Sequence, residues 1–367
     1  MKRILLASLL ILLPISPAQS STLITLTAPT NKLADGRFVN NDLALSISPG
    51  GDLGKALEIT ASSNRTWLID PALIEEIVDL VDGYIYLDQE GKDVEVAPFD
   101  LANLWLLKLQ SLTRDNRVVA ITYGAPSQAF LERLAPGELS RYNSLSKLRL
   151  EALLNREVIT PGKSSVEGEP ALIAKNAYTA LRKSVKITNS VITSKDVEDL
   201  RLGLAKTLNP KLSKESAFLI SKSYSAAIKE VNNKVRISPG NYTITTKNYD
   251  LPLTIINDFT QPVSLDLIIT TTNSRVLVDD VPRITIDGQS QIQIEVPIEV
   301  IASGDTSLRL QLYTPKKDLI GLEQRIPLRL AVISPVTTWL TTGMAIILLL
   351  AAIVQSVEEL RAGEANE

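Results

Sequence analysis

The sequence contains no cysteine and no histidine. Disulfide bonds, Ser–His–Asp and Cys–His catalytic groups, and the usual zinc, copper and iron–sulfur sites are therefore excluded, and no metal or cofactor is expected. A surplus of one charge sign is also missing, because 38 Lys and Arg residues face 41 Asp and Glu residues for a net charge of -3. This balance lacks the basic excess with which proteins bind nucleic acid, so no such partner is expected. A hydrophobic content of 45% over 367 residues predicts two or three folded domains.

The first twenty residues have the pattern of a secretory signal peptide. Lys2 and Arg3 precede an apolar run at 4–13, and Pro14 ends that run. The small residues Ala18 and Ser20 then lie three and one positions before a cleavage site. The run is shorter than the ~20 residues that cross a bilayer. Residues 1–20 are therefore predicted to be a signal peptide that directs the chain out of the cytoplasm.

A second apolar segment lies near the C-terminus, at 336–354. No charged residue interrupts it, Trp339 stands near one end, and its length as a helix is ~28 Å. We expect a single transmembrane helix here, with residues 355–367 as a cytoplasmic tail. The expected location is the cell membrane, single-pass, with the bulk of the chain extracytoplasmic and the membrane as a partner through this helix.

Between these ends the pattern changes twice. Residues 21–160 alternate short apolar strands with helical stretches, which predicts a partial, barrel-like parallel α/β sheet. In residues 161–234 the apolar residues recur at helical spacing, with lysines at the edges of the expected helices. In residues 235–334 apolar and polar residues alternate in runs separated by turn residues, as in an immunoglobulin-like β-sandwich. In the N-terminal region the expected strands are 43–47, 66–69, 84–87 and 118–122, and the expected helices are 53–61, 71–80, 101–112 and 126–134.

Candidate chemical groups follow the expected parallel strands, because ligands of α/β sheets bind at the carboxyl ends of strands. These groups are Asp70, Asp88 and Tyr123. A carboxylate pair can cleave a glycoside without histidine. Each candidate also has a structural interpretation: Asp70 caps the helix that starts at Pro71, Asp88 belongs to a solvated turn, and Tyr123 packs at a strand end. The glycine-rich loop at 48–54 is open to two interpretations, an anion cradle or a plain turn.

Several motifs, in order, resemble an actinobacterial envelope family known as domain of unknown function 6049. The motifs are Ser48–Leu53, Thr66–Leu73, Val118–Gly124, Leu251–Asp258 and Gln261–Val263. The resemblance implies a secreted region similar to glycoside hydrolase or deacetylase barrels, an immunoglobulin-like domain and one membrane span. It also implies a cell-wall glycan and the lipid II flippase as partners, since family members are commonly encoded beside that flippase.

The chain departs from the family in two ways. Where the family follows Tyr–Gly with Asp–Pro–Asp, this sequence has Ala125–Pro126–Ser127, so both carboxylates are missing. The α/β region is also shorter than the ~250 residues of a complete barrel, which makes the chain a shortened member.

These observations favour a non-catalytic, membrane-anchored envelope protein. It would bind a glycan or a protein partner in peptidoglycan-precursor traffic or cell-wall assembly. Two alternatives stay open: a histidine-independent glycan hydrolase that uses Asp70 with a second carboxylate, and a structural spacer without a ligand.

Overall fold

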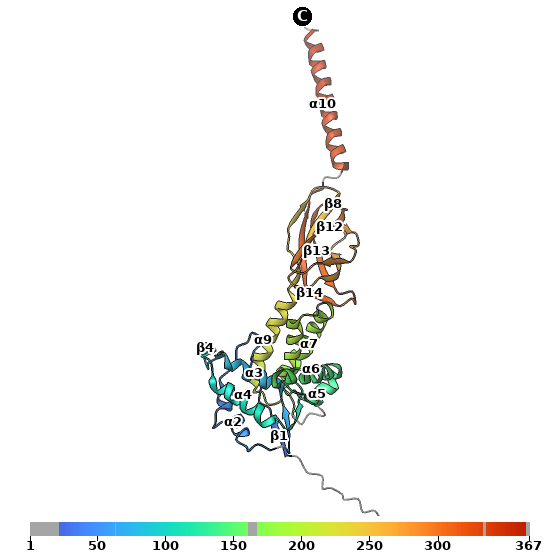
Figure 1. Ribbon diagram of the computed structural model, residues 1–367. Helices are drawn as coiled ribbons and strands as arrows, with labels where there is room; N and C mark the ends of the chain where they lie inside the picture. Colours follow the sequence, from blue (N-terminus) through green and yellow to red (C-terminus); the bar gives the residue numbers. More distant parts are fainter. Residues whose placement is uncertain (1–21, 63, 161–166, 333–334, 365–367) are drawn as a thin grey trace, which may run out of the picture. The chain divides into compact units, whose positions relative to one another are not determined.

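The computed structural model describes residues 22–62, 64–160, 167–332 and 335–364 (Figure 1). The predicted signal peptide at 1–20 lies outside these residues. The chain divides into two compact units, one of Met1–Tyr178 with Leu202–Tyr224 and one of Thr179–Arg201 with Ser225–Glu367. The predicted domain boundaries at 160 and 234 stay predictions.

The first unit contains a parallel sheet of three strands in the order β1-β2-β5. These strands are β1 (Thr22–Leu26), β2 (Arg65–Ile69) and β5 (Arg117–Ala120). The predicted strands at 66–69 and 118–122 are confirmed as β2 and β5, although β5 is the shorter. The predicted strand at 84–87 is also confirmed as β3 (Tyr84–Leu87), but it pairs antiparallel with β4 (Asp93–Val96) in a separate sheet.

One expected strand is wrong, because residues 43–47 form part of helix α1 (Asp42–Ile47). The physical reason is the spacing of its buried side chains. Leu43, Ala44 and Ile47 are buried while Leu45 is 63% exposed. Positions i, i+1 and i+4 share one face of a helix, whereas a strand would bury alternate residues.

Most of the other elements between residues 42 and 232 are helices. The predicted helices at 71–80 and 101–112 are confirmed as α3 and α4, and the one at 126–134 as the shorter α5. The helical elements are α2 (Asp52–Ala56), α3 (Pro71–Val81), α4 (Asp100–Thr113), α5 (Gln128–Leu134), α6 (Pro136–Leu154), α7 (Leu172–Val191), α8 (Lys195–Gly203), the 3-10 helix η1 (Leu204–Leu208) and α9 (Lys214–Asn232).

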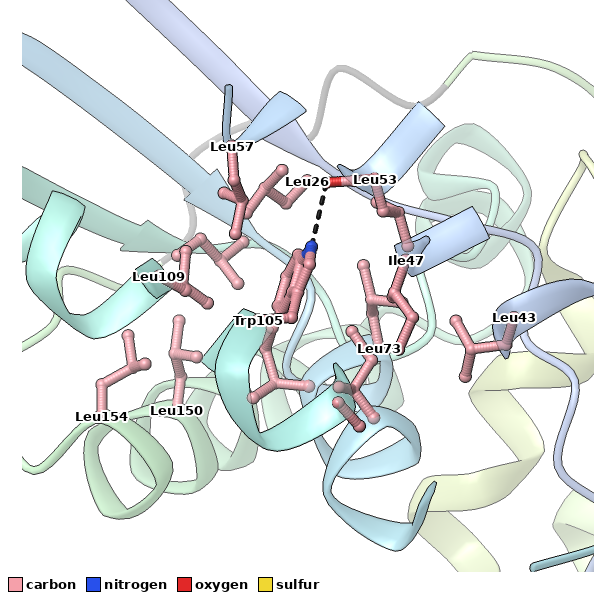
Figure 2. Close-up of a cluster of buried hydrophobic side chains, with 14 of the residues drawn as sticks. Leu26, Leu43, Ile47, Leu53, Leu57, Leu73, Trp105, Leu109, Leu150 and Leu154 are labelled. Atoms are coloured by element: carbon pink, nitrogen blue, oxygen red, sulfur yellow. Dashed lines mark hydrogen bonds between the residues drawn. The ribbon is translucent and has the colours of Figure 1, made fainter. Parts of the chain in front are cut away.

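A buried apolar cluster fixes α1–α4 and α6 to the sheet (Figure 2). Trp105 of α4 lies among leucine and isoleucine side chains, and its indole Nε1 donates a hydrogen bond of 2.9 Å to the carbonyl of Leu53. This bond satisfies the polar end of the ring, so the tryptophan adds apolar burial to the core without leaving its own N–H unpaired.

The second unit carries two sheets, of four strands in the order β10-β12-β8-β6 and of five in the order β11-β9-β13-β14-β7. All pairings are antiparallel except β14 with β7. The strands are β6 (Val235–Ile237), β7 (Tyr242–Ile244), β8 (Asn248–Asn257), β9 (Val263–Thr271), β10 (Val276–Val278), β11 (Ile284–Ile286), β12 (Ser290–Val300), β13 (Gly304–Tyr313) and β14 (Leu319–Leu330). The outermost strands are each three residues long, which leaves little sheet edge open to pairing.

The fold class predicted from the sequence is wrong as a whole. The molecule is mixed α/β, with a three-stranded parallel sheet instead of a barrel-like one and curled β half-barrels instead of an immunoglobulin-like sandwich. The curl has a physical cause in the long strands. Twist accumulates over ten to twelve residues in β8, β12, β13 and β14, and a register shift between Leu310 and Leu312 bends β13 further.

The predicted transmembrane helix is also corrected. Helix α10 (Pro335–Glu364) covers residues 336–354, but no helix in the described ranges is both long and apolar enough to cross a bilayer. The wholly apolar run, Met344–Val354, starts only after Thr342 and Gly343 and is ~16 Å long as a helix, against ~30 Å of hydrocarbon. This finding contradicts the predicted membrane anchor, and with it the single-pass location, the cytoplasmic tail and the membrane as a partner.

Candidate functional site

The end of β2 places Asp70 in the interior of the first unit. Asp70 is the N-cap of α3, and its Oδ1 accepts a hydrogen bond of 2.9 Å from the Ala72 amide. The same oxygen accepts a second bond of 2.9 Å from the Gly124 amide. The side chain is 0% exposed. Asp70 therefore caps α3 and also ties it to the segment that follows β5.

Gly124 makes this tie possible because of its backbone conformation. Its φ is +74°, and a Cβ at this position would lie 2.8 Å from the Lys206 Cα. Only glycine combines a left-handed backbone with such a close approach. The loop after β5 is therefore packed directly against η1, and the carbonyl of Gly124 accepts a bond of 3.0 Å from the Asn209 amide group.

We expect Gly124→Ala to lower the free energy of unfolding by about 3 kcal/mol, because it adds backbone strain and a collision with Lys206. Gly91→Ala is the matched control, since Gly91 has a φ of +78° with nothing within 4 Å of an added Cβ. Gly91→Ala therefore adds backbone strain without a collision and should lower the free energy of unfolding by about 1 kcal/mol. Urea unfolding measures both, and equal losses would show that the contact with Lys206 is unimportant.

A buried ion pair lies beside Asp70. The Lys206 Nζ is 2.9 Å from Glu76 Oε1, and their side chains are 5% and 1% exposed. The other Glu76 oxygen accepts a hydrogen bond of 2.9 Å from the Asn31 amide. The ammonium also lies 5.7 Å from the ring centroid of Tyr123, within cation–π range.

Neither Glu76 nor Lys206 was found by the sequence reasoning, although a signal exists. Glu76 stands on the buried face of α3 between Leu73 and Leu80, and Lys206 interrupts the apolar stretch 202–208. Burying one charged side chain on an apolar face is costly unless an opposite charge compensates it. An acidic residue on one such face and a basic residue on another therefore indicate a buried ion pair.

Tyr123 joins the same cluster from the other side. Its hydroxyl donates a 2.5 Å hydrogen bond to Glu75 Oε2, and Arg149 lies 3.3 Å from the other Glu75 oxygen. The Tyr123 amide donates a bond of 2.7 Å to the Ser146 hydroxyl of α6. The structure therefore brings Asp70 and Tyr123 into one cluster through Gly124 and Lys206.

The electrostatics of the cluster follow from its burial. Loss of hydration raises the pKa of Asp70 to about 7, and nearby Glu76 adds to the rise, while the bonds from Gly124 and Ala72 and the charge of Lys206 oppose it. Asp70 Oδ2 is buried without a hydrogen-bond partner among the described residues, so its lost hydration is not compensated. Burial also raises the pKa of the Tyr123 hydroxyl well above its usual value.

Lys206 behaves differently, because it has a partner. Burial lowers the pKa of an ammonium, but the adjacent Glu76 carboxylate outweighs this effect and holds the Lys206 pKa well above its ordinary value. Burial thus favours the uncharged forms of Asp70 and Tyr123, while the raised pKa of Lys206 favours its ammonium form.

The remaining sequence candidates lie elsewhere. Asp88 is in the β3–β4 turn, where its Oδ1 accepts bonds of 2.8 Å from the amides of Glu90 and Lys92. The loop at 48–51 is a hydrogen-bonded turn between α1 and α2, closed by Gly51 to Ser48 at 2.8 Å. Over the described residues, no group of three acidic side chains is placed to hold a metal ion.

Comparison with known proteins gives a family but no characterised relative. The sequence model of the family of unknown function DUF6049 matches residues 143–361, more than half of the chain, and the chain belongs to this family. The predicted resemblance is therefore confirmed, although the motifs before residue 143 lie outside the match. No curated protein matches the chain.

Similarity to solved structures is weak. WR4, an MSP family member of C. elegans, is 9% identical, with 27% of this chain and 99% of that one covered at a TM-score of 0.22. A PapD-like domain of human CEP192 is 13% identical over 28% of this chain and 88% of that one, with a TM-score of 0.22. The E. coli chaperone DraB is 15% identical over 27% of this chain and 57% of that one, with a TM-score of 0.21. At these scores the similarities define neither fold nor function.

Proposed function

We propose that this chain is a non-catalytic binding protein that takes a cell-wall glycan as its ligand. The absence of catalysis is proposed because Asp70 is completely buried and its Oδ1 accepts hydrogen bonds from two backbone amides. A carboxyl in this position holds α3 and the loop after β5 together. It has no exposed atom with which to meet a saccharide.

The geometry gives less support to a glycan hydrolase. Such an enzyme needs two carboxyl groups on either side of a bound glycosidic link. Glu76, a buried carboxylate on α3, is 1% exposed and paired with Lys206 and the Asn31 backbone amide. Both acids would have to leave these partners before a substrate could enter. Cell-wall assembly as the process is part of the proposal and rests on the resemblance described under the sequence. A pocket in the second unit, lined by Ile256, Asp258, Gln289, Ser290 and Gln291 and described below, supports a binding role.

The proposal is tested by incubating the purified chain with isolated peptidoglycan sacculi. We expect the chain to sediment with the sacculi and to release no reducing ends above a buffer blank. Asp70→Asn, which keeps an acceptor for both amides, should sediment equally well. Release of reducing ends by the native chain that Asp70→Asn abolishes would establish a hydrolase, and absence of sedimentation would favour a spacer.

A further inference from the structure

A pocket of about 440 Å³ opens in the second unit, where β8 and β12 begin to pair. It is lined by Ile256, Asp258, Gln289, Ser290 and Gln291. Ser290 pairs with Asn257, and Gln291 with Ile256, in the antiparallel register of these strands. The pocket is thus formed by two adjacent strand ends and the turns beside them. Its volume lies within the range of small-ligand sites.

A fully buried asparagine fixes the walls of this pocket. The Asn257 amide group donates to the carbonyls of Gln261 at 2.9 Å, Ile286 at 3.3 Å and Asp287 at 2.9 Å, and its oxygen accepts from Phe259 at 3.0 Å. These bonds tie the turn after β8 to the turn before β12. The two turns also pack closely, since a Cβ on Gly288 would lie 2.1 Å from the Thr260 carbonyl oxygen. The walls are therefore formed before a ligand arrives, which lowers the entropy cost of binding.

One pocket residue holds an unfavourable backbone conformation. Gln289 has a φ of +49°, a region that residues with a side chain seldom adopt, and its amide donates a bond of 2.6 Å to the Phe259 carbonyl. Glycine would adopt the same conformation without strain. Strain held at the rim of a pocket is an observation from which a role in ligand binding can be inferred.

The chemistry of the lining is polar and nearly neutral. The carboxamides of Gln289 and Gln291 are exposed and make no hydrogen bond to another described residue, and each offers one acceptor and two donors. The Asp258 carboxylate is held by the Arg236 guanidinium, which compensates its charge. The half-buried Ile256 adds an apolar surface beside these polar groups.

We propose that this pocket binds a neutral saccharide, with the carboxamides of Gln289 and Gln291 bonded to hydroxyl or acetamido groups and Ile256 against the C–H face of a sugar ring. The inference rests on the proposed function and assigns its ligand site. A sugar presents both donors and acceptors, as the two carboxamides do, while an anionic ligand would meet the Asp258 carboxylate and find its guanidinium partner already engaged.

The test is calorimetric titration of the full chain with chitotetraose, a neutral oligosaccharide, and with tetragalacturonate, an anionic one. We expect Gln289→Gly to weaken chitotetraose binding at least tenfold while leaving the melting temperature unchanged or higher. Gln291→Thr should weaken it by a similar factor. Two matched controls should bind as the native chain does: Lys317→Gly, where φ is +67° in a turn outside the pocket, and Gln293→Thr, two residues further along β12.

The outcomes separate this inference from the proposed function. If the chain sediments with sacculi and binds chitotetraose, but Gln289→Gly and Gln291→Thr bind as well as the controls, the pocket is not the site and the inference is wrong. Equal or tighter binding of tetragalacturonate would also overturn it. If the native chain neither sediments with sacculi nor binds chitotetraose, the proposed function itself fails.

Discussion

Lys206→Met is expected to lower the free energy of unfolding by about 3–5 kcal/mol, because methionine fills much of the same space but leaves the Glu76 carboxylate buried without its partner. The Asn31 amide alone then compensates that charge. The measurement is urea unfolding of the native chain and the variant at neutral pH, followed by circular dichroism.

Two further variants show whether the loss comes from the unpaired charge. In the double variant Glu76→Leu with Lys206→Met both charges are absent, and most of the lost stability should return. Lys32→Met is the matched control, because Lys32 pairs with Asp79 at side-chain exposures of 27% and 36% and should cost at most about 1 kcal/mol. A double variant as unstable as Lys206→Met would show that packing, and not charge, causes the loss.

Asp70→Asn is expected to remove a large part of the pH dependence of stability. The pKa of Asp70 is raised to about 7 in the folded chain from an ordinary 3.8. The folded state therefore holds this proton more tightly than the unfolded state does. The resulting stabilisation is fully present below about pH 4 and is lost as the pH rises through about 7, by up to about 4 kcal/mol. Asparagine is uncharged at every pH and can still accept both amide bonds.

The measurement compares native and variant unfolding free energies at pH 5 and pH 8. The native chain should lose stability relative to Asp70→Asn between these values, so that the variant is the more stable of the two at pH 8. Asp70→Ala is the matched control, because it loses the bonds from Ala72 and Gly124 and should be less stable than Asp70→Asn at both pH values. Parallel pH profiles for the native chain and Asp70→Asn would contradict the raised pKa.

Local patterns were predictable where neighbouring residues decide the outcome. The Asp70–Pro71 sequence correctly predicted the start of α3, since an N-cap acceptor and a first-turn proline act within one turn of helix. Alternation of apolar and polar residues in the C-terminal region likewise predicted strands correctly, for example β9 and β12. The error at 43–47 arose because five residues of mixed apolar pattern fit either period, and burial against the rest of the core favoured the helix.

The candidate site was only partly predictable, for a reason of distance along the chain. Asp70 and Tyr123 could be singled out because each follows an apolar strand. Their common neighbour, Lys206, is 130 residues from its partner Glu76, and no spacing rule connects them. The pocket lined by Gln289 and Gln291 was not predictable either, because it depends on two turns that tertiary contacts bring together, the bonds of Asn257 among them.

The sequence by itself determined that thiol and imidazole side chains are absent from the 367 residues, the family to which the chain belongs and the local start of α3. These depend on which residues are present and on their immediate neighbours. The tertiary structure alone decided that Asp70 is a buried cap with a raised pKa, that Glu76 and Lys206 form a pair, and that the long β strands curl. The physical reason is that burial sets both hydration and charge pairing, and burial depends on segments distant in the sequence.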